Sequence, residues 1–233
     1  MVQPLILQYY QLLPERRHDE DPVAWPKKFP KGLARFKTAV EARYNESTLQ
    51  RLLGSQTLEV RQAAILALGM VGANQANSFL VKCLRDEDLV SRQLADQALR
   101  AVWQRSDTPD NNRELQRLIG QIGSKQHEEE TLRGFEALVR KAPRFAEAFN
   151  QRAIFYFVRG NYSKAIHDFE KALRLNPFHF AAAAGMGQCF MKQKKLRAAL
   201  RIYRRTNRIN PNLSKVRETI ASLERMLGEE GKK

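Results

Sequence analysis

The sequence predicts an all-α fold in which helical hairpins repeat to form a solenoid. Two observations carry this prediction: residues recur at an interval of 34 in the C-terminal half and at an interval of 31 in the N-terminal half. No segment shows the sustained polar–apolar alternation that is typical of strands. The chain has 233 residues, 43% of them hydrophobic, which is enough for two short domains with a sizeable core.

Residues 1–30 are expected to form an N-terminal arm. Pro22, Pro26 and Pro30 surround Trp25, and prolines at this spacing forbid one continuous helix. We expect the proline-rich stretch around Trp25 to wrap as an extended arm with Trp25 as a buried anchor.

Residues 31–105 carry the 31-residue period. Eight columns match between its two copies: Leu49 and Leu80, Leu53 and Leu84, Leu58 and Leu89, Arg61 and Arg92, Ala64 and Ala95, Ala67 and Ala98, Leu68 and Leu99, and Val71 and Val102. Each copy has a leucine-rich first helix, a turn, and a second helix of the form Arg-x-x-Ala-x-x-Ala-Leu. The pattern resembles HEAT repeats of the short variety. Residues 31–44 fit the same columns as the second helix of an incomplete first unit, whose first helix would come from residues 1–13.

Residues 106–111 form the predicted linker, because Ser106–Asn112 has the composition of a turn and loop between two helical patterns. The linker is short enough for the two arrays to stack.

Residues 112–228 carry the 34-residue period. Three columns run in phase over three units: Pro143, Pro177 and Pro211; Phe135, Phe169 and Tyr203; Thr131, Ala165 and Ala199. Each unit is expected to be two short helices, with breaks such as Gly160-Asn161 and Asn176-Pro177. Small residues would let neighbouring helices approach closely, aromatic residues would fill the remaining volume, and proline would end each second helix.

This stretch resembles the tetratricopeptide repeat family. Residues 149–177 fit the family pattern at nearly every signature position. The next unit also fits, with Thr206 for the usual small residue and Lys194 where glycine is common. The unit ending at Pro143 is weaker, since Leu138 replaces a small residue. Residues 212–227 resemble the amphipathic helix that closes such arrays, in which each unit covers only its neighbour.

Charge is concentrated in the second array. The chain has a formal charge of +15 and a pI near 10.1, and residues 112–233 hold 25 basic against 12 acidic side chains. A basic patch is predicted along one side of the helix after the turn at Lys192, and it consists of Lys194, Lys195, Arg197, Arg201, Arg204, Arg205 and Arg208. It could bind a phosphate backbone or an acidic peptide, or simply form a solvated outer face.

The family resemblance also implies a groove lined by the first helix of each unit. The positions that would meet a ligand are Asn150, Ile154, Phe157, Val158, Ala184, Gln188, Met191 and Lys192. These residues are mostly apolar, which favours an extended or helical apolar peptide. Family members that grip a carboxylate use Lys and Asn, whereas Ile154 and Ala184 occupy such positions here. Alternatively, Phe157 and Met191 pack against a neighbouring segment.

No catalytic or metal-binding constellation stands out. Cys83 and Cys189 are far apart, which excludes an ordinary disulfide framework or zinc module, and both are expected to be buried and inert in a reducing compartment. The histidines lack metal spacing, and a solvated or capping role is expected for His167 and His179. The Gly185-Met-Gly187 stretch follows no strand, so close helix packing explains it better than phosphate binding.

These observations predict a non-catalytic scaffold that binds a protein or peptide in its groove and an acidic partner along its basic flank. Neither a cofactor nor a small-molecule substrate is expected, and the chain should be cytoplasmic without a membrane span. The main alternative is charge-driven binding of RNA or DNA. A remote alternative is a bilin lyase-like enzyme, because HEAT-like arrays also resemble those of bilin lyases.

Overall fold

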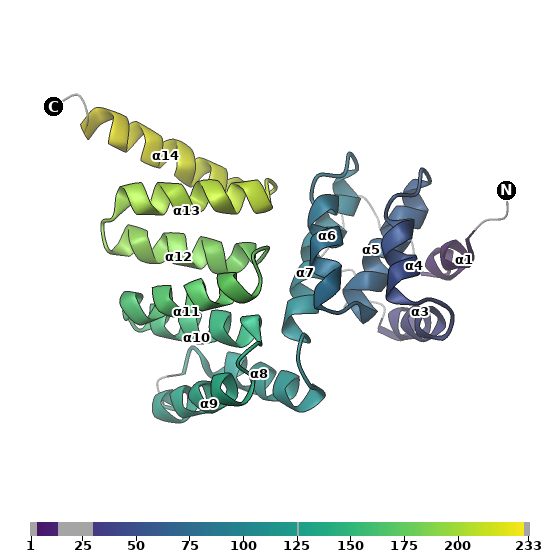
Figure 1. Ribbon diagram of the computed structural model, residues 1–233, viewed down its shortest axis with the longest axis horizontal. Helices are drawn as coiled ribbons and strands as arrows, with labels where there is room; N and C mark the ends of the chain where they lie inside the picture. The colour runs from purple at the N-terminus through teal and green to yellow at the C-terminus, as the bar shows by residue number, and fades with distance from the viewer. Residues whose placement is uncertain (1–3, 14–29, 125, 231–233) are drawn as a thin grey trace. The chain divides into compact units, whose positions relative to one another are not determined.

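The computed structural model describes residues 4–13, 30–124 and 126–230, and all regular structure in these residues is helical (Figure 1). The predicted all-α, helical-repeat fold is thereby confirmed. The chain divides into two compact units, residues 1–103 and 104–233. Trp25 and most of the predicted arm lie outside the described residues.

The described residues of unit 1 form three pairs of helices. Its helices are α1 (Leu5–Gln11), α3 (Pro30–Arg43), α4 (Glu46–Leu52), α5 (Leu58–Val71), α6 (Asn77–Cys83) and α7 (Leu89–Gln104), with a short 3-10 helix, η1 (Asn74–Ala76), before α6. The columns Leu49 and Leu80, and Leu68 and Leu99, are fully buried as their 31-residue spacing predicts. Leu89, the first residue of α7, differs from these columns, with 56% of its surface exposed.

Helix α1 contacts both α3 and α5, and it lies where the missing first helix of the incomplete unit was expected. Ile6 is buried, and its backbone N–H donates a hydrogen bond of 2.8 Å to the Tyr44 hydroxyl just after α3. The rings of Tyr10 and Phe36 meet edge to face at 6.4 Å. These contacts bring an N-terminal helix of only seven residues into the same core as the later hairpins.

Unit 2 also consists of hairpins, followed by one closing helix. Its helices are α8 (Pro109–Gln121), α9 (Glu128–Lys141), α10 (Ala146–Val158), α11 (Tyr162–Leu175), α12 (Phe180–Lys192), α13 (Leu196–Ile209) and α14 (Ser214–Glu230). Figure 1 shows α10 to α13 stacked in order with α14 against α13. The predicted linker, residues 106–111, includes the first turn of α8, since Thr108 caps this helix and Pro109 begins it.

The 34-residue columns of unit 2 occupy equivalent places in its three hairpins. Phe135, Phe169 and Tyr203 are all buried. The second helices end at Lys141, Leu175 and Ile209, each two residues before one of the repeated prolines. The spacing therefore marks hairpin junctions, as predicted.

The weakest hairpin, α8 with α9, compensates for its larger side chains. Leu138 is buried where a small residue is usual, and Leu118 is also fully buried. Gly134 makes room, because a Cβ atom built there would lie 2.5 Å from the Leu118 Cδ2 atom. A small residue at a different position thus restores the close approach of the two helices.

Candidate functional site

The predicted groove residues come from α10 and α12, two first helices that contact each other. Val158 is the most exposed large hydrophobic side chain on these helices, at 58%, and Gln188 and Lys192 are also exposed. Ile154, Phe157, Ala184 and Met191 are half-buried. Phe157 and Met191 belong partly to the hydrophobic packing of unit 2 and partly to its surface.

Asn150 differs from the expectation that it lines an open groove. Only 2% of its surface is exposed, and its side-chain N–H donates at 3.3 Å to each carboxylate oxygen of Glu147. Its Oδ1 atom is buried without a hydrogen-bond partner in the part of the chain that the structure describes. The α10–α12 face is therefore more apolar than the sequence suggested.

Glu147 and His179 form a buried cluster that the sequence did not predict. The Nε2 atom of His179 lies 2.6 Å from Glu147 Oε2, while Nδ1 accepts a hydrogen bond from the Ala182 backbone N–H, which caps α12. Because Nδ1 accepts, the imidazole carries its proton on Nε2 and donates it to the carboxylate. The capping role expected for His179 is confirmed, although this side chain is fully buried rather than solvated.

A second pair, between half-buried Arg152 and buried Asp168, joins α10 to α11. Both oxygens of Asp168 accept from Arg152, at 2.6 and 2.8 Å, and the guanidinium also lies near the rings of Phe149 and Tyr156. Burial alone would lower the pKa of Arg152, but the hydrogen bond and charge of Asp168 outweigh it, so the pKa is raised. This guanidinium remains charged and links α10 to α11.

Arg159 fastens the α8–α9 turn to α10. Its guanidinium donates to the backbone carbonyls of Ile122 and Ser124, pairs with Glu128 at 3.0 Å and stacks 3.6 Å from the Phe155 ring centre. Arginine suits this place because a planar fork can donate in several directions while one face covers an aromatic ring. Sequence periodicity gave no signal for these contacts.

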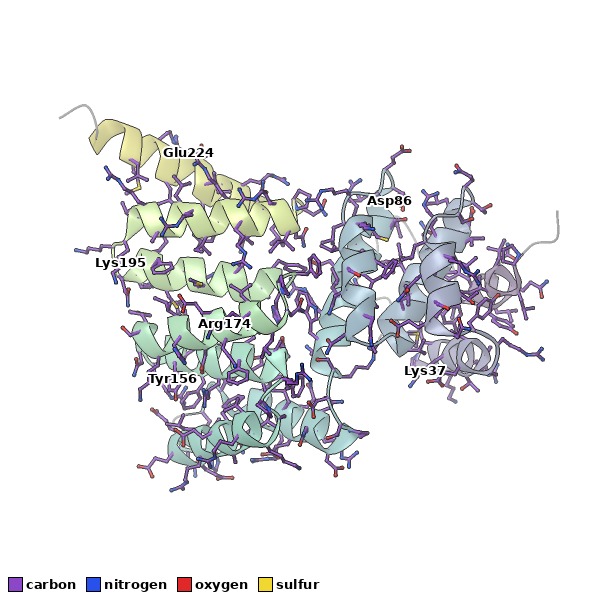
Figure 2. All side chains as sticks on the ribbon, viewed as in Figure 1. Lys37, Asp86, Tyr156, Arg174, Lys195 and Glu224 are labelled. Atoms are coloured by element: carbon purple, nitrogen blue, oxygen red, sulfur yellow. The ribbon has the colours of Figure 1, made fainter. Side chains whose placement is uncertain are left out.

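The basic patch lies on α13 and on the turn before it. Its members are exposed except for Arg205, which is half-buried, and Figure 2 labels Lys195 at the turn and Glu224 on α14. Arg204 is paired with an acidic side chain of the closing helix, because it donates to Glu224 at 2.7 and 3.2 Å. The pair is solvent-exposed and screened, so the α13 surface keeps its positive potential.

The thiols are buried, as expected. Burial raises the pKa of Cys83 to about 11 and that of Cys189 to about 12. A thiol with so high a pKa carries almost no thiolate near neutral pH, so neither side chain is an activated nucleophile.

Unit 1 has a concavity of its own that the sequence did not predict. It has a volume of about 170 Å³ and lies between α3, α5 and α7, where Leu33, Leu66, Met70 and Leu94 contribute apolar walls. Gly69 keeps α5 close to α7, since a Cβ atom there would lie 2.8 Å from the Ala98 Cβ atom.

Across the described ranges, His, Cys, Asp and Glu side chains nowhere gather in a group of three or more that could hold a metal ion. Within the same ranges, none of the helices combines the length and the apolar character needed to cross a membrane.

Comparison with known proteins identifies both repeat types. Residues 146–179 match the tetratricopeptide repeat model, and residues 12–100 match a model of HEAT repeats. A TPR repeat-containing protein of Rhizobium etli is 47% identical over 51 residues, which is 22% of this chain and 24% of that protein. The chain thus matches about a quarter of the length of this curated relative.

Solved structures of TPR domains are similar at low identity. The Sgt2 TPR domain from Aspergillus fumigatus is 16% identical, with a TM-score of 0.49 over 54% of this chain and 84% of that one. The first TPR of Spaghetti (RPAP3), bound to an HSP90 peptide, is 18% identical, with a TM-score of 0.48 over 52% of this chain and 96% of that one. From the two sequence-model matches and the hairpins that contain them, the chain carries HEAT repeats in its first part and a tetratricopeptide repeat in its second.

Proposed function

We propose that this chain is a non-catalytic interaction scaffold that binds a protein segment along the exposed face of α10 and α12. The observation that carries the proposal is Val158, a large apolar side chain that is 58% exposed beside half-buried Ile154 and Phe157. Contiguous apolar surface is characteristic of binding sites, and we propose that Val158 forms such a surface with Ile154 and Phe157. Covering a side chain such as Val158 contributes about 1 to 2 kcal/mol to binding.

The character of this face favours a peptide with apolar anchors over one with a charged end. Ile154 and Ala184 present no hydrogen-bonding side-chain groups, and the side-chain N–H of buried Asn150 is engaged by Glu147. A partner with apolar side chains at helical or extended spacing would satisfy such a surface. Exposed Gln188 and Lys192 would supply polar contacts at its edge.

The ionisable clusters of unit 2 support a binding role rather than catalysis. Glu147 pairs with His179, and Arg152 pairs with Asp168. Both ring nitrogens of His179 are engaged in hydrogen bonds. These groups stabilise the hairpins that present the binding face. The basic patch, in turn, is proposed to hold an acidic partner beside the peptide site.

The test uses peptides selected from a random displayed library against the full-length protein. Val158→Asp should weaken binding of the selected peptides about tenfold or more, because a carboxylate would be placed in an apolar contact. Leu89→Asp is the matched control, since Leu89 is 56% exposed and lies on α7 of unit 1. Peptides that bind Val158→Asp and Met191→Asp as tightly as the wild type would reject the assignment of this face.

A further inference from the structure

We propose that the outer surface of α11 and α13 binds the phosphate backbone of a double-stranded nucleic acid without reading its sequence. We call this surface the outer basic face and define it by Arg197, Arg201, Arg205 and Arg208 on α13 with Lys171 and Arg174 on α11. The inference rests on the proposed function in one respect, namely that the flank of unit 2 serves an acidic partner.

The four arginines of α13 share one side of the helix. At 3.6 residues per turn, they fall within about 80° of arc, and at 1.5 Å per residue they cover about 16 Å along the axis. Tyr203 and Thr206 lie on the opposite side and are buried. The helix therefore presents guanidinium groups as a line rather than as scattered charges.

The 34-residue register extends this line onto the neighbouring hairpin. Lys171 and Arg174 precede Arg205 and Arg208 by 34 residues, so they occupy the same positions on α11. Arg174 is exposed, and Figure 2 labels it on α11. Lys171 is half-buried, and its Nζ atom lies 5.9 Å from the centre of the Phe149 ring. The sequence has no Asp or Glu from residue 171 to residue 217, so this stretch adds no negative charge of its own to the face. Cations therefore occur at matching positions of the two successive second helices, α11 and α13.

The absence of apolar anchors on this surface favours a nucleic acid over an acidic protein. Protein interfaces generally place aromatic or aliphatic side chains at their centre and exclude charge from it. The most exposed large hydrophobic residues described by the structure are elsewhere: Leu12, Phe79, Leu89, Val158 and Met226. Nucleic-acid interfaces are more polar and much more positive, which matches a surface built from guanidinium groups.

The positions of the aromatic residues favour a duplex over a single strand. Proteins that hold single strands stack the bases on exposed aromatic rings. Phe169 of α11 and Tyr203 of α13 are buried in the hydrophobic packing instead. A duplex offers its phosphates without unstacking its bases, and about 16 Å of its axis carries about five phosphates per strand.

The experiment measures binding of the full-length protein to fluorescent duplexes of about 24 base pairs by anisotropy, from about 50 to 200 mM salt. Two DNA duplexes of unrelated sequence and one RNA duplex are used. We expect equal affinity for the two DNA sequences and a linear fall of log affinity with log salt. The affinity for the RNA duplex, compared with that for the DNA duplexes, shows which kind of duplex the protein prefers.

The double variant Arg201→Gln with Arg205→Gln should bind duplex about tenfold or more weakly at low salt. Its log–log slope should be less steep by about 1.8, because each lost phosphate contact removes about 0.9. The control is Arg35→Gln with Arg43→Gln, which removes the same charge from exposed positions of α3 in unit 1. Circular dichroism checks that both variants keep the helicity of the wild type.

Three results would overturn the inference. The first is no duplex binding at the lowest salt. The second is an equal loss in the α3 control, which would indicate net charge alone. The third is binding of poly-glutamate but not of duplex, which would assign the face to acidic proteins. Val158→Asp should retain duplex binding. A wild-type protein that binds duplex but no peptide would reject the groove proposal alone. A wild-type protein that binds peptide but no duplex would reject this inference alone.

Discussion

The helices of the hairpins α10–α11 and α12–α13 occupy the same positions of the 34-residue repeat. Different kinds of side chain, however, fill the space between the two helices of each hairpin. Half-buried Arg152 and buried Asp168 form an ion pair in the first hairpin. The residues 34 positions later are Met186 and Ile202, which pack in one hydrophobic cluster. The repeat therefore specifies the volume between its two helices. Either an ion pair or apolar side chains can fill that volume.

The largest expected effect comes from breaking the ion pair at one end. Arg152→Ala should lower the free energy of unfolding by about 3 to 5 kcal/mol, because it leaves the Asp168 carboxylate buried without its partner. The double variant Arg152→Met with Asp168→Ile copies the second hairpin and should regain most of that loss. Urea unfolding followed by circular dichroism measures both. A double variant no more stable than Arg152→Ala would show that the two solutions are not interchangeable.

A smaller effect on stability is expected at a position where one hairpin has alanine and the other has glycine. Ala153 in the first hairpin corresponds to Gly187 in the second, where a Cβ atom would lie 2.9 Å from the Tyr203 ring. Gly187→Ala should therefore cost about 1 to 3 kcal/mol of stability through overpacking. Gly120→Ala on α8 is the control, since a Cβ atom there meets nothing within 4 Å and helix propensity alone favours alanine. A rise in melting temperature for Gly187→Ala would contradict the close approach of these helices.

The smallest effect is expected at the turns. Gly160 has a φ angle of +74°, and Lys194, its counterpart, has a φ angle of +58°. Left-handed backbone costs a residue with a Cβ atom about 1 kcal/mol. Lys194→Gly should consequently raise the free energy of unfolding by about 0.5 kcal/mol, after the larger entropy of glycine in the unfolded chain is subtracted.

Gly160→Ala should lower the free energy of unfolding by about 1 kcal/mol for the same reason. Thermal unfolding of the two variants beside the wild type gives the comparison directly. Shifts of the same sign in Lys194→Gly and Gly160→Ala would contradict the claim that the left-handed backbone at both turns favours glycine over a residue with a Cβ atom.

Periodicity predicted the parts of the fold that depend on burial. The columns of Phe135 and Leu49 mark buried positions because a residue at a fixed place in each hairpin meets the same neighbours. The departure at Lys194 was also visible from the sequence, and its strained φ angle is the structural consequence. The ends of the second helices were predictable as well, because a proline follows each of them at the same position of the repeat.

Pairings between side chains were not predictable in the same way. The contact of Glu147 with His179 joins residues 32 positions apart, and that of Arg204 with Glu224 joins a repeat to the closing helix. Neither pair repeats in register, so no column reveals it. The burial of Asn150 depends on Glu147 beside it, and this single pairing made the candidate face more apolar than the spacing implied.

The most direct test of the central claim is a calorimetric comparison of one selected peptide with the wild type, Val158→Asp and Leu89→Asp. The exposed apolar face of α10 and α12 predicts that the dissociation constant rises about tenfold or more for Val158→Asp and stays unchanged for Leu89→Asp. Equal dissociation constants for all three proteins would contradict the claim that this face holds the partner.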